Sequence, residues 1–180
     1  MSVDVPAEPR YFGQRVRRSE DPRFLLGQAQ YVDDLRFAGV LHAAFIRSDE
    51  AHARIVGVDA TAARELEGVV AVLTGKEAAD SWEPMRYDST FPGWQGSEFW
   101  PLATNKVRFV GEPIACVVAR DRYVAEDAAE LVEVGYDPLP AVASVDAALA
   151  PGAARIHETW SDNCFLRRHI ETDGFDDALA

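Results

Sequence analysis

The stretch VRFVGEPIACVVARDRYVAEDAAELVEVGYDPLP, residues 107–140, decides the fold. Two apolar, β-capable runs at 107–110 and 114–119 stand on either side of a turn that contains Gly111 and Pro113. An acidic segment of helical character follows, and after it comes the β-capable run VEVGY. We therefore predict a strand, a turn, a second strand, an acidic helix and a third strand, in this order.

The predicted helix is amphipathic. Asp121 stands where a side chain can cap the first turn. Four apolar residues are spaced for one helical face: Val124, Ala128, Leu131 and Val132. The acidic residues lie largely off that face, so we expect them in solvent: Glu126, Asp127, Glu130 and Glu133.

A strand, a turn and a helix are also the outline of a nucleotide-binding unit, but the turn here argues against one. A phosphate-binding loop needs several glycines so that backbone N–H groups can approach the anion. This turn has Gly111 alone, followed by Glu112, which would repel phosphate, and Pro113, which lacks an N–H donor. We interpret Gly111 as a tight turn between strands.

The preceding segments predict further strands at 40–48, 53–60 and 69–74. A short helix fits between the second and the third, with Asp59 as its cap and Gly68 at its end. The order suggests a βαβ step, and the continuous apolar run of the last strand predicts that both of its faces are covered. The predicted class is therefore α+β, a mixed sheet with βαβ-like units and one long aromatic excursion.

That excursion occupies residues 76–105 and is rich in proline and glycine. Its segment 82–100 is too aromatic for a disordered linker, so its rings must be buried on this domain or on a neighbour. Three of its tryptophans are candidate interface residues: Trp82, Trp94 and Trp100. A small ligand bound between this segment and the sheet is a further alternative.

Residues 1–26 are polar and weakly periodic, which predicts an N-terminal arm that needs another surface to order it. We expect a domain at 27–140 and a linker from 141, which opens with a helix candidate at 144–150. Arginine suits interface pairing, so four arginines of the arm are candidate interface residues, with simple solvation as the alternative: Arg15, Arg17, Arg18 and Arg23.

Composition narrows the class of protein. The formal net charge of −12 argues against sequence-independent binding to nucleic acid or to anionic lipid. No apolar run is long enough to span a bilayer, and the N-terminus lacks the apolar core of a secretory signal. Two cysteines do not make a disulfide framework, so the cytoplasm is the expected location.

Chemical candidates are few. Asp33 and Asp34 are adjacent and would point to opposite faces of a strand, so a turn role with a local backbone bond is favoured. The four histidines lack metal-ligand spacing. Cys116 predicts a buried, small apolar side chain, whereas Cys164 has no base visibly paired with it. We assign no catalytic, cofactor-binding or metal-binding residue.

Five stretches carry a resemblance: GQRVRRSEDPRFLLGQAQYVDDL from residue 13, LHAAFIRSDEAHARIVGVDATAA from 41, GVVAVLTG from 68, PLATNKVRFVGEPIACVVARDRYVAEDAAELVEVGYDPLPAV from 101, and ALAPGAARIHE from 148. In order and spacing they resemble the N-terminal part of the molybdenum hydroxylase large subunit. This family contains xanthine dehydrogenase, aldehyde oxidase and carbon monoxide dehydrogenase. The resemblance covers residues 13 to 175 or so and implies an α/β-hammerhead fold.

The resemblance also implies an oxidoreductase. Its members hydroxylate N-heteroaromatics, purines or aldehydes with oxygen from water, or oxidise carbon monoxide, at a molybdenum–pterin cofactor. The implied partners are the rest of the large subunit, a small subunit with [2Fe-2S] clusters and, in many members, an FAD subunit. The large subunit's cofactor domain would begin within 141–180.

Departures from the family pattern limit what is carried over. The segments that hold the pterin and the late glutamate base are not found, which implies that these residues provide structure and subunit contacts rather than catalysis. We expect either a split or a shortened large subunit. Where the family commonly reads Ser-Pro-His-Ala-His, this chain has SDEAH at 48–52. A free-standing, non-catalytic hammerhead scaffold or binding module is the alternative.

Overall fold

The computed structural model describes residues 12–87, 89–169, 174 and 179. It divides the chain into two units, Met1–Val40 and Leu41–Ala180. The first contains α1 (Asp21–Leu25) and a short 3-10 helix, η1 (Val32–Asp34). In η1 an Asp34 carboxylate oxygen accepts a hydrogen bond from the backbone N–H of Tyr31 at 2.9 Å, which confirms the turn role for this aspartate. Residues 1–11 of the predicted arm lie outside the described residues.

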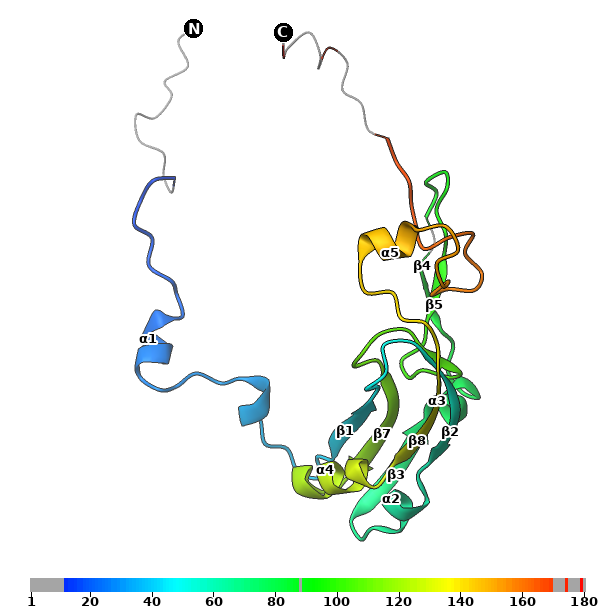
Figure 1. Cartoon of the computed structure of the whole chain (residues 1–180). Coiled ribbons are helices and arrows are strands. Elements are labelled where there is room, and N and C mark those ends of the chain that lie inside the picture. The colour runs from blue at the N-terminus through cyan, green and yellow to red at the C-terminus, as the bar shows by residue number, and fades with distance from the viewer. Residues whose placement is uncertain (1–11, 88, 170–173, 175–178, 180) are drawn as a thin grey trace, which may run out of the picture. The chain divides into compact units, whose positions relative to one another are not determined.

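The second unit is built on two three-stranded antiparallel sheets (Figure 1). One has the order β1 (His42–Arg47), β7 (Pro113–Ala119) and β3 (Val69–Thr74). The other has the order β6 (Lys106–Val107), β2 (Ala53–Asp59) and β8 (Glu133–Pro138). A separate two-stranded hairpin pairs β4 (Met85–Tyr87) with β5 (Ser97–Phe99).

Strand β7 is the central strand of the first sheet and has cover on both faces. Val117 lies in a core cluster with Val72 and Ala128. Cys116, its neighbour in sequence, points to the other face and packs with Ala78 and Leu102. Two-sided cover explains the continuous apolar sequence of this strand. It also confirms that Cys116 is a buried, free cysteine.

Helices of the second unit pack against strands of the first sheet. They are α2 (Thr61–Glu65), α3 (Gly75–Ala79) and α4 (Arg122–Glu130). Asp121 caps α4 as predicted, since its Oδ1 accepts from the backbone N–H of Val124 at 2.9 Å. This bond is the main reason that the pKa of Asp121 lies below its ordinary value.

The predicted faces of α4 are largely confirmed. Ala128 and Val132 are buried, Val124 is half-buried, and the four acidic residues are exposed. Leu131 is 42% exposed because it follows the last helical turn, where it forms the C-cap. The helix α5 (Val145–Leu149) is also confirmed, with Ser144 Oγ accepting from the N–H of Ala147.

The α+β class is confirmed, but the strand pairing corrects one expectation. All strand pairs in the described part of the chain are antiparallel, so the predicted mixed sheet with βαβ-like units is not formed. The strands on either side of α2 belong to different sheets, as do the strands on either side of α4. A parallel crossover needs about a dozen residues or more, and only 60–68 separate β2 from β3.

Two strands also differ from the prediction, one in the exposure of its side chains and the other in its length. The pairing of β3 with β7 shifts register between Val69 and Ala71, and Val70 at this irregularity is 60% exposed instead of covered. The predicted strand at 107–110 is only the two-residue β6, because the backbone N–H of Arg108 turns to bond the carboxylate of Glu112. Gly111 has a φ of 87°, which confirms the tight turn.

Figure 1 shows α5 and the β4–β5 hairpin at one end of the two sheets, with α2 and α4 toward the other end. No helix within the described residues is long and apolar enough to cross a membrane.

Candidate functional site

The aromatic excursion folds as the β4–β5 hairpin. Met85 stands opposite Phe99, and Arg86 stands opposite Glu98. Arg86 and Glu98 form an ion pair at 3.0 Å on one face. On the other face the rings of Tyr87 and Phe99 meet edge to face at 5.9 Å between centroids. The hairpin therefore has one charged face and one aromatic face.

We call residues 91–96 the hairpin tip and residues 156–168 the C-terminal loop. The tip binds this loop mainly through Gln95, whose backbone N–H donates to the carbonyl of Phe165 at 2.8 Å. The Gln95 side chain donates from Nε2 to the carbonyl of Cys164 at 2.7 Å and accepts at Oε1 from the N–H of Ser161 at 2.6 Å. The oxygen and the nitrogen of the Gln95 side-chain amide therefore both bond to the C-terminal loop.

Two aromatic residues complete the contact. Trp94 meets Phe165 edge to face at 5.4 Å, and the indole N–H of Trp160 donates to the carbonyl of Gly96 at 2.7 Å. The ring of Trp94 is half-buried in consequence. At this position the aromatic excursion finds cover within its own unit.

A cleft of about 770 Å³ lies between the hairpin, the segment around β6 and the C-terminal loop. Its aromatic walls include Tyr87, Phe99, Trp100 and Phe109. The place is the one expected for a ligand between the aromatic segment and the sheet. Its volume lies within the range of small-molecule sites, about 300–1,000 Å³.

The charged groups around this cleft are paired with one another. The ammonium of Lys106, whose side chain is 4% exposed, lies 2.5 Å from Glu158 and also donates to the carbonyl of Ile156 at 2.7 Å. Arg108 reaches Glu158 at 3.7 Å. Burial alone would raise the pKa of Glu158, but the hydrogen bond from Lys106 and the two cations hold it below its ordinary value.

Two further titratable groups line the cleft, and burial shifts the pKa of each. His157 stacks on Trp160 at 4.2 Å, and its pKa is lowered by burial and then by Arg108 and Lys106. Burial raises the pKa of Glu112, although the N–H of Arg108 opposes the shift. Because Arg86 is paired with Glu98, and Lys106 and Arg108 are paired with Glu158, the aromatic walls of the cleft suit an uncharged, planar or apolar group rather than a phosphate.

The described residues contain no group of three or more His, Cys, Asp and Glu residues that could hold a metal ion. No iron or molybdenum ligand set of that kind, and no reaction step, is therefore assigned to the described residues.

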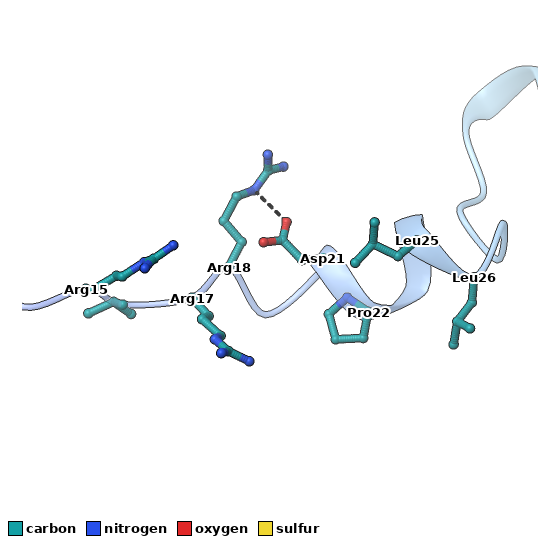
Figure 2. Close-up of a pocket in the computed structure, with 8 residues that line it drawn as sticks. Arg15, Arg17, Arg18, Asp21, Pro22, Leu25 and Leu26 are labelled. Carbon is teal, nitrogen blue, oxygen red and sulfur yellow. Dashed lines mark ion pairs between the residues drawn. The ribbon is translucent and has the colours of Figure 1, made fainter.

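The predicted interface residues fall into the two units. Arg18 lies 3.6 Å from Asp21, and Figure 2 shows Arg17 pointing away from that pair. Arg23 pairs with Glu20 at 2.7 Å. Arg15, Arg17 and Arg18 line a pocket of about 870 Å³ in the arm, together with Leu25 and Leu26. All four arginines are exposed.

The tryptophans differ in exposure. Trp82 is 42% exposed, whereas Trp94 and Trp100 are half-buried, against Phe165 and in the cleft wall respectively. Sequence reasoning missed Gln95 and the Lys106–Glu158 pair. The sequence feature that could have pointed to Gln95 is its position close to the Pro92-Gly93 turn, inside the aromatic segment.

Comparison with known proteins defines the family. Residues 26–140 match the family described as aldehyde oxidase and xanthine dehydrogenase, a/b hammerhead domain. The chain belongs to this family, and the hammerhead fold implied by the resemblance is confirmed.

Individual relatives agree with this assignment. The chain is 44% identical over 150 residues to the carbon monoxide dehydrogenase large chain of Afipia carboxidovorans, covering 83% of this chain and 18% of that one. It is 36% identical over 143 residues to the xanthine dehydrogenase molybdenum-binding subunit of Escherichia coli O157:H7, covering 73% and 18%.

A solved structure agrees as well. The crystal structure of quinoline 2-oxidoreductase from Pseudomonas putida 86 has a TM-score of 0.78 and 43% identity, covering 83% of this chain and 19% of that one. The chain thus spans about a fifth of the length of the relatives that it matches.

Proposed function

We propose that this chain is the hammerhead portion of a molybdenum hydroxylase large subunit. The observation that carries the proposal is the family match over residues 26–140, supported by 43% identity to the quinoline 2-oxidoreductase structure. The complete enzyme is an oxidoreductase. It hydroxylates an N-heteroaromatic, purine or aldehyde with oxygen from water, or it oxidises carbon monoxide.

In this proposal the chain contributes structure and contacts, and the chemistry is supplied by a molybdenum–pterin cofactor held elsewhere in the large subunit. Electrons leave through [2Fe-2S] clusters in a small subunit, and some assemblies add an FAD subunit. The relative from Escherichia coli is named a molybdenum-binding subunit, and this name supports molybdenum as the metal of the proposed enzyme. We place the assembly in the cytoplasm.

The proposed division of labour follows the expected layout of the chain. Residues 1–26 are an arm that grips sibling polypeptides, 27–140 are the hammerhead domain, and 141–180 connect it to the cofactor domain. Exposed apolar residues beside the arginines support an interface role for the arm, since Leu25 is 86% and Leu26 is 70% exposed. The exposed Trp82 is proposed to meet the same assembly.

The reaction class is tested on the assembly that purifies with this chain. Candidate substrates are a set of N-heteroaromatics, purines and aldehydes, and carbon monoxide, each supplied with an artificial electron acceptor in ¹⁸O-labelled water. The proposal predicts oxidation of one of them, with oxygen from water in the hydroxylated product. Activity that needs O₂ as the oxygen source, or no activity with any of these classes, contradicts it.

A further inference from the structure

We propose that the hairpin tip is a clamp that fixes the course of the C-terminal loop, with Gln95 as its positioning residue. The contact joins residues that are 64 to 77 positions apart in the sequence, from Gly96 with Trp160 to Phe91 with Arg168. It does not depend on the assembly or the cofactor described above, so it goes beyond the proposed function.

The chemistry of the contact selects an amide at position 95. Oε1 accepts from the backbone N–H of Ser161 at 2.6 Å and from its hydroxyl at 3.1 Å. Nε2 donates to the carbonyl of Cys164 at 2.7 Å, with Asp162 Oδ1 at 3.4 Å. A carboxylate could serve the first pair but not the second, because an ionised carboxylate only accepts hydrogen bonds.

The flanking residues of the tip hold the same loop at its two ends. Near the start of the contact, Trp160 donates its indole N–H to the carbonyl of Gly96. Near its end, the guanidinium of Arg168 lies over the ring of Phe91 at 4.6 Å from the centroid. Successive contacts along the tip prevent the loop from pivoting about any single bond.

Hydrogen bonds of Asn163 and one from Lys106 also hold the C-terminal loop in place. Asn163 accepts at Oδ1 from the N–H of Ile156 and donates from Nδ2 to the carbonyl of Ala154, both at 2.9 Å. Lys106 donates to the carbonyl of Ile156. Because the loop forms one wall of the cleft, the clamp also sets the distance between that wall and the hairpin.

The test compares three variants of the full chain by hydrogen exchange. The measured quantity is the protection factor of the Ser161 backbone amide at pH 8 and at pH 4.5. Gln95→Ala removes both side-chain bonds. Gln95→Glu keeps the acceptor and removes the donor at neutral pH. Glu98→Gln is the matched control, because it alters the same hairpin but affects the ion pair with Arg86 instead of the loop.

We expect Gln95→Ala to lower the protection of Ser161 by roughly tenfold at every pH, since about two hydrogen bonds are lost. Gln95→Glu should show a smaller loss at pH 8, because its carboxylate still accepts from the Ser161 N–H but has no proton to donate to the Cys164 carbonyl. It should recover toward wild type at pH 4.5, where a protonated carboxyl can donate to Cys164. The pKa of Asp162 lies below its ordinary value of 3.8, chiefly through the N–H of Cys164, so this neighbour stays ionised during the recovery.

Equal protection in wild type and Gln95→Ala overturns the proposal, and so does a Gln95→Glu variant without any pH-dependent recovery. If either variant fails to fold, Trp160→Phe tests the same clamp by removing one indole donor. An unchanged protection factor for Ser161 in Trp160→Phe would likewise contradict the proposal. None of these readouts needs a metal, so they separate this inference from the proposed function.

Discussion

Gly75 and Ala103 are in such close contact that a Cβ on Gly75 would lie 2.0 Å from the carbonyl oxygen of Ala103. Gly75 begins α3, directly after the capping residue Thr74. The next two nearest atoms are also backbone, the carbonyl carbon of Ala103 at 2.6 Å and the carbonyl oxygen of Leu102 at 3.1 Å, so no flexible side chain can move aside. Gly75 directly precedes the aromatic excursion and Ala103 lies near its end. Their contact therefore holds both ends of the excursion together beside the first sheet.

The first prediction follows from this contact. Gly75→Ala should lower the free energy of unfolding by about 3 kcal/mol, because overpacking against backbone forces the chain to shift. Gly57→Ala is the matched control, since a Cβ at Gly57 meets nothing within 4 Å. Urea unfolding measures both. A Gly75→Ala variant as stable as the control would show that the contact is not close in solution.

The second prediction concerns the buried ammonium of Lys106. Glu158→Gln removes its charged partner and should cost about 1–3 kcal/mol. Lys106→Met should cost less, because it removes the buried charge together with the need for a partner. Glu67→Gln is the control, as Glu67 has a 94% exposed side chain 3.7 Å from Arg120.

The pH dependence of that pair has a definite sign. The pKa of Glu158 is lower in the folded chain than its ordinary value of 4.5, so the stabilisation is present above that value and is lost as the pH falls below it. The difference in stability between wild type and Glu158→Gln should shrink in acid. A difference that is constant from pH 7 to pH 3 would contradict the pairing.

The third prediction separates the two cysteines. Cys116 is buried, and burial raises the pKa of its thiol, so it should react with a thiol reagent only when the chain unfolds. Cys164 is half-buried and should react first in the native chain. Mass spectrometry of the labelled peptides assigns the order. Early labelling of Cys116 would mean that β7 is not covered on both faces.

The fourth prediction concerns the proposed interface of the arm. Replacing both Arg15 and Arg17 by Ala should weaken capture of partner subunits by at least about tenfold, because arginine anchors dominate many interfaces. The melting temperature of the hammerhead unit should stay unchanged. Arg36→Ala is the control, since the Arg36 guanidinium bonds to the backbone carbonyl of Asp33 at 2.6 Å. Equal capture by wild type and the double variant would leave these arginines as solvated surface.

Local features of the fold could be predicted from the sequence because they depend on neighbouring residues. The cap at Asp121, the apolar face of α4 and the turn at Gly111 each follow from residue type and short spacing. Pairing could not be predicted in the same way. Periodicity indicates that β2 and β3 are strands, but it does not say that they belong to different sheets.

The candidate site was less accessible to sequence reasoning, because its contacts join distant parts of the chain. Gln95 looks like any polar turn residue until the carbonyl of Cys164 is placed beside its amide. Lys106 looks like a surface lysine, yet its side chain is buried under the loop that carries Glu158. The aromatic composition alone indicated that this segment buries rings, and for Trp94 the partner is Phe165.

The most direct test of the assignment is the metal content of the assembly that purifies with this chain from its natural source. Elemental analysis should find molybdenum equimolar with the chain, and electron paramagnetic resonance of the reduced sample should show [2Fe-2S] clusters. A chain that purifies with neither metal, or without any companion polypeptide, would contradict the central claim.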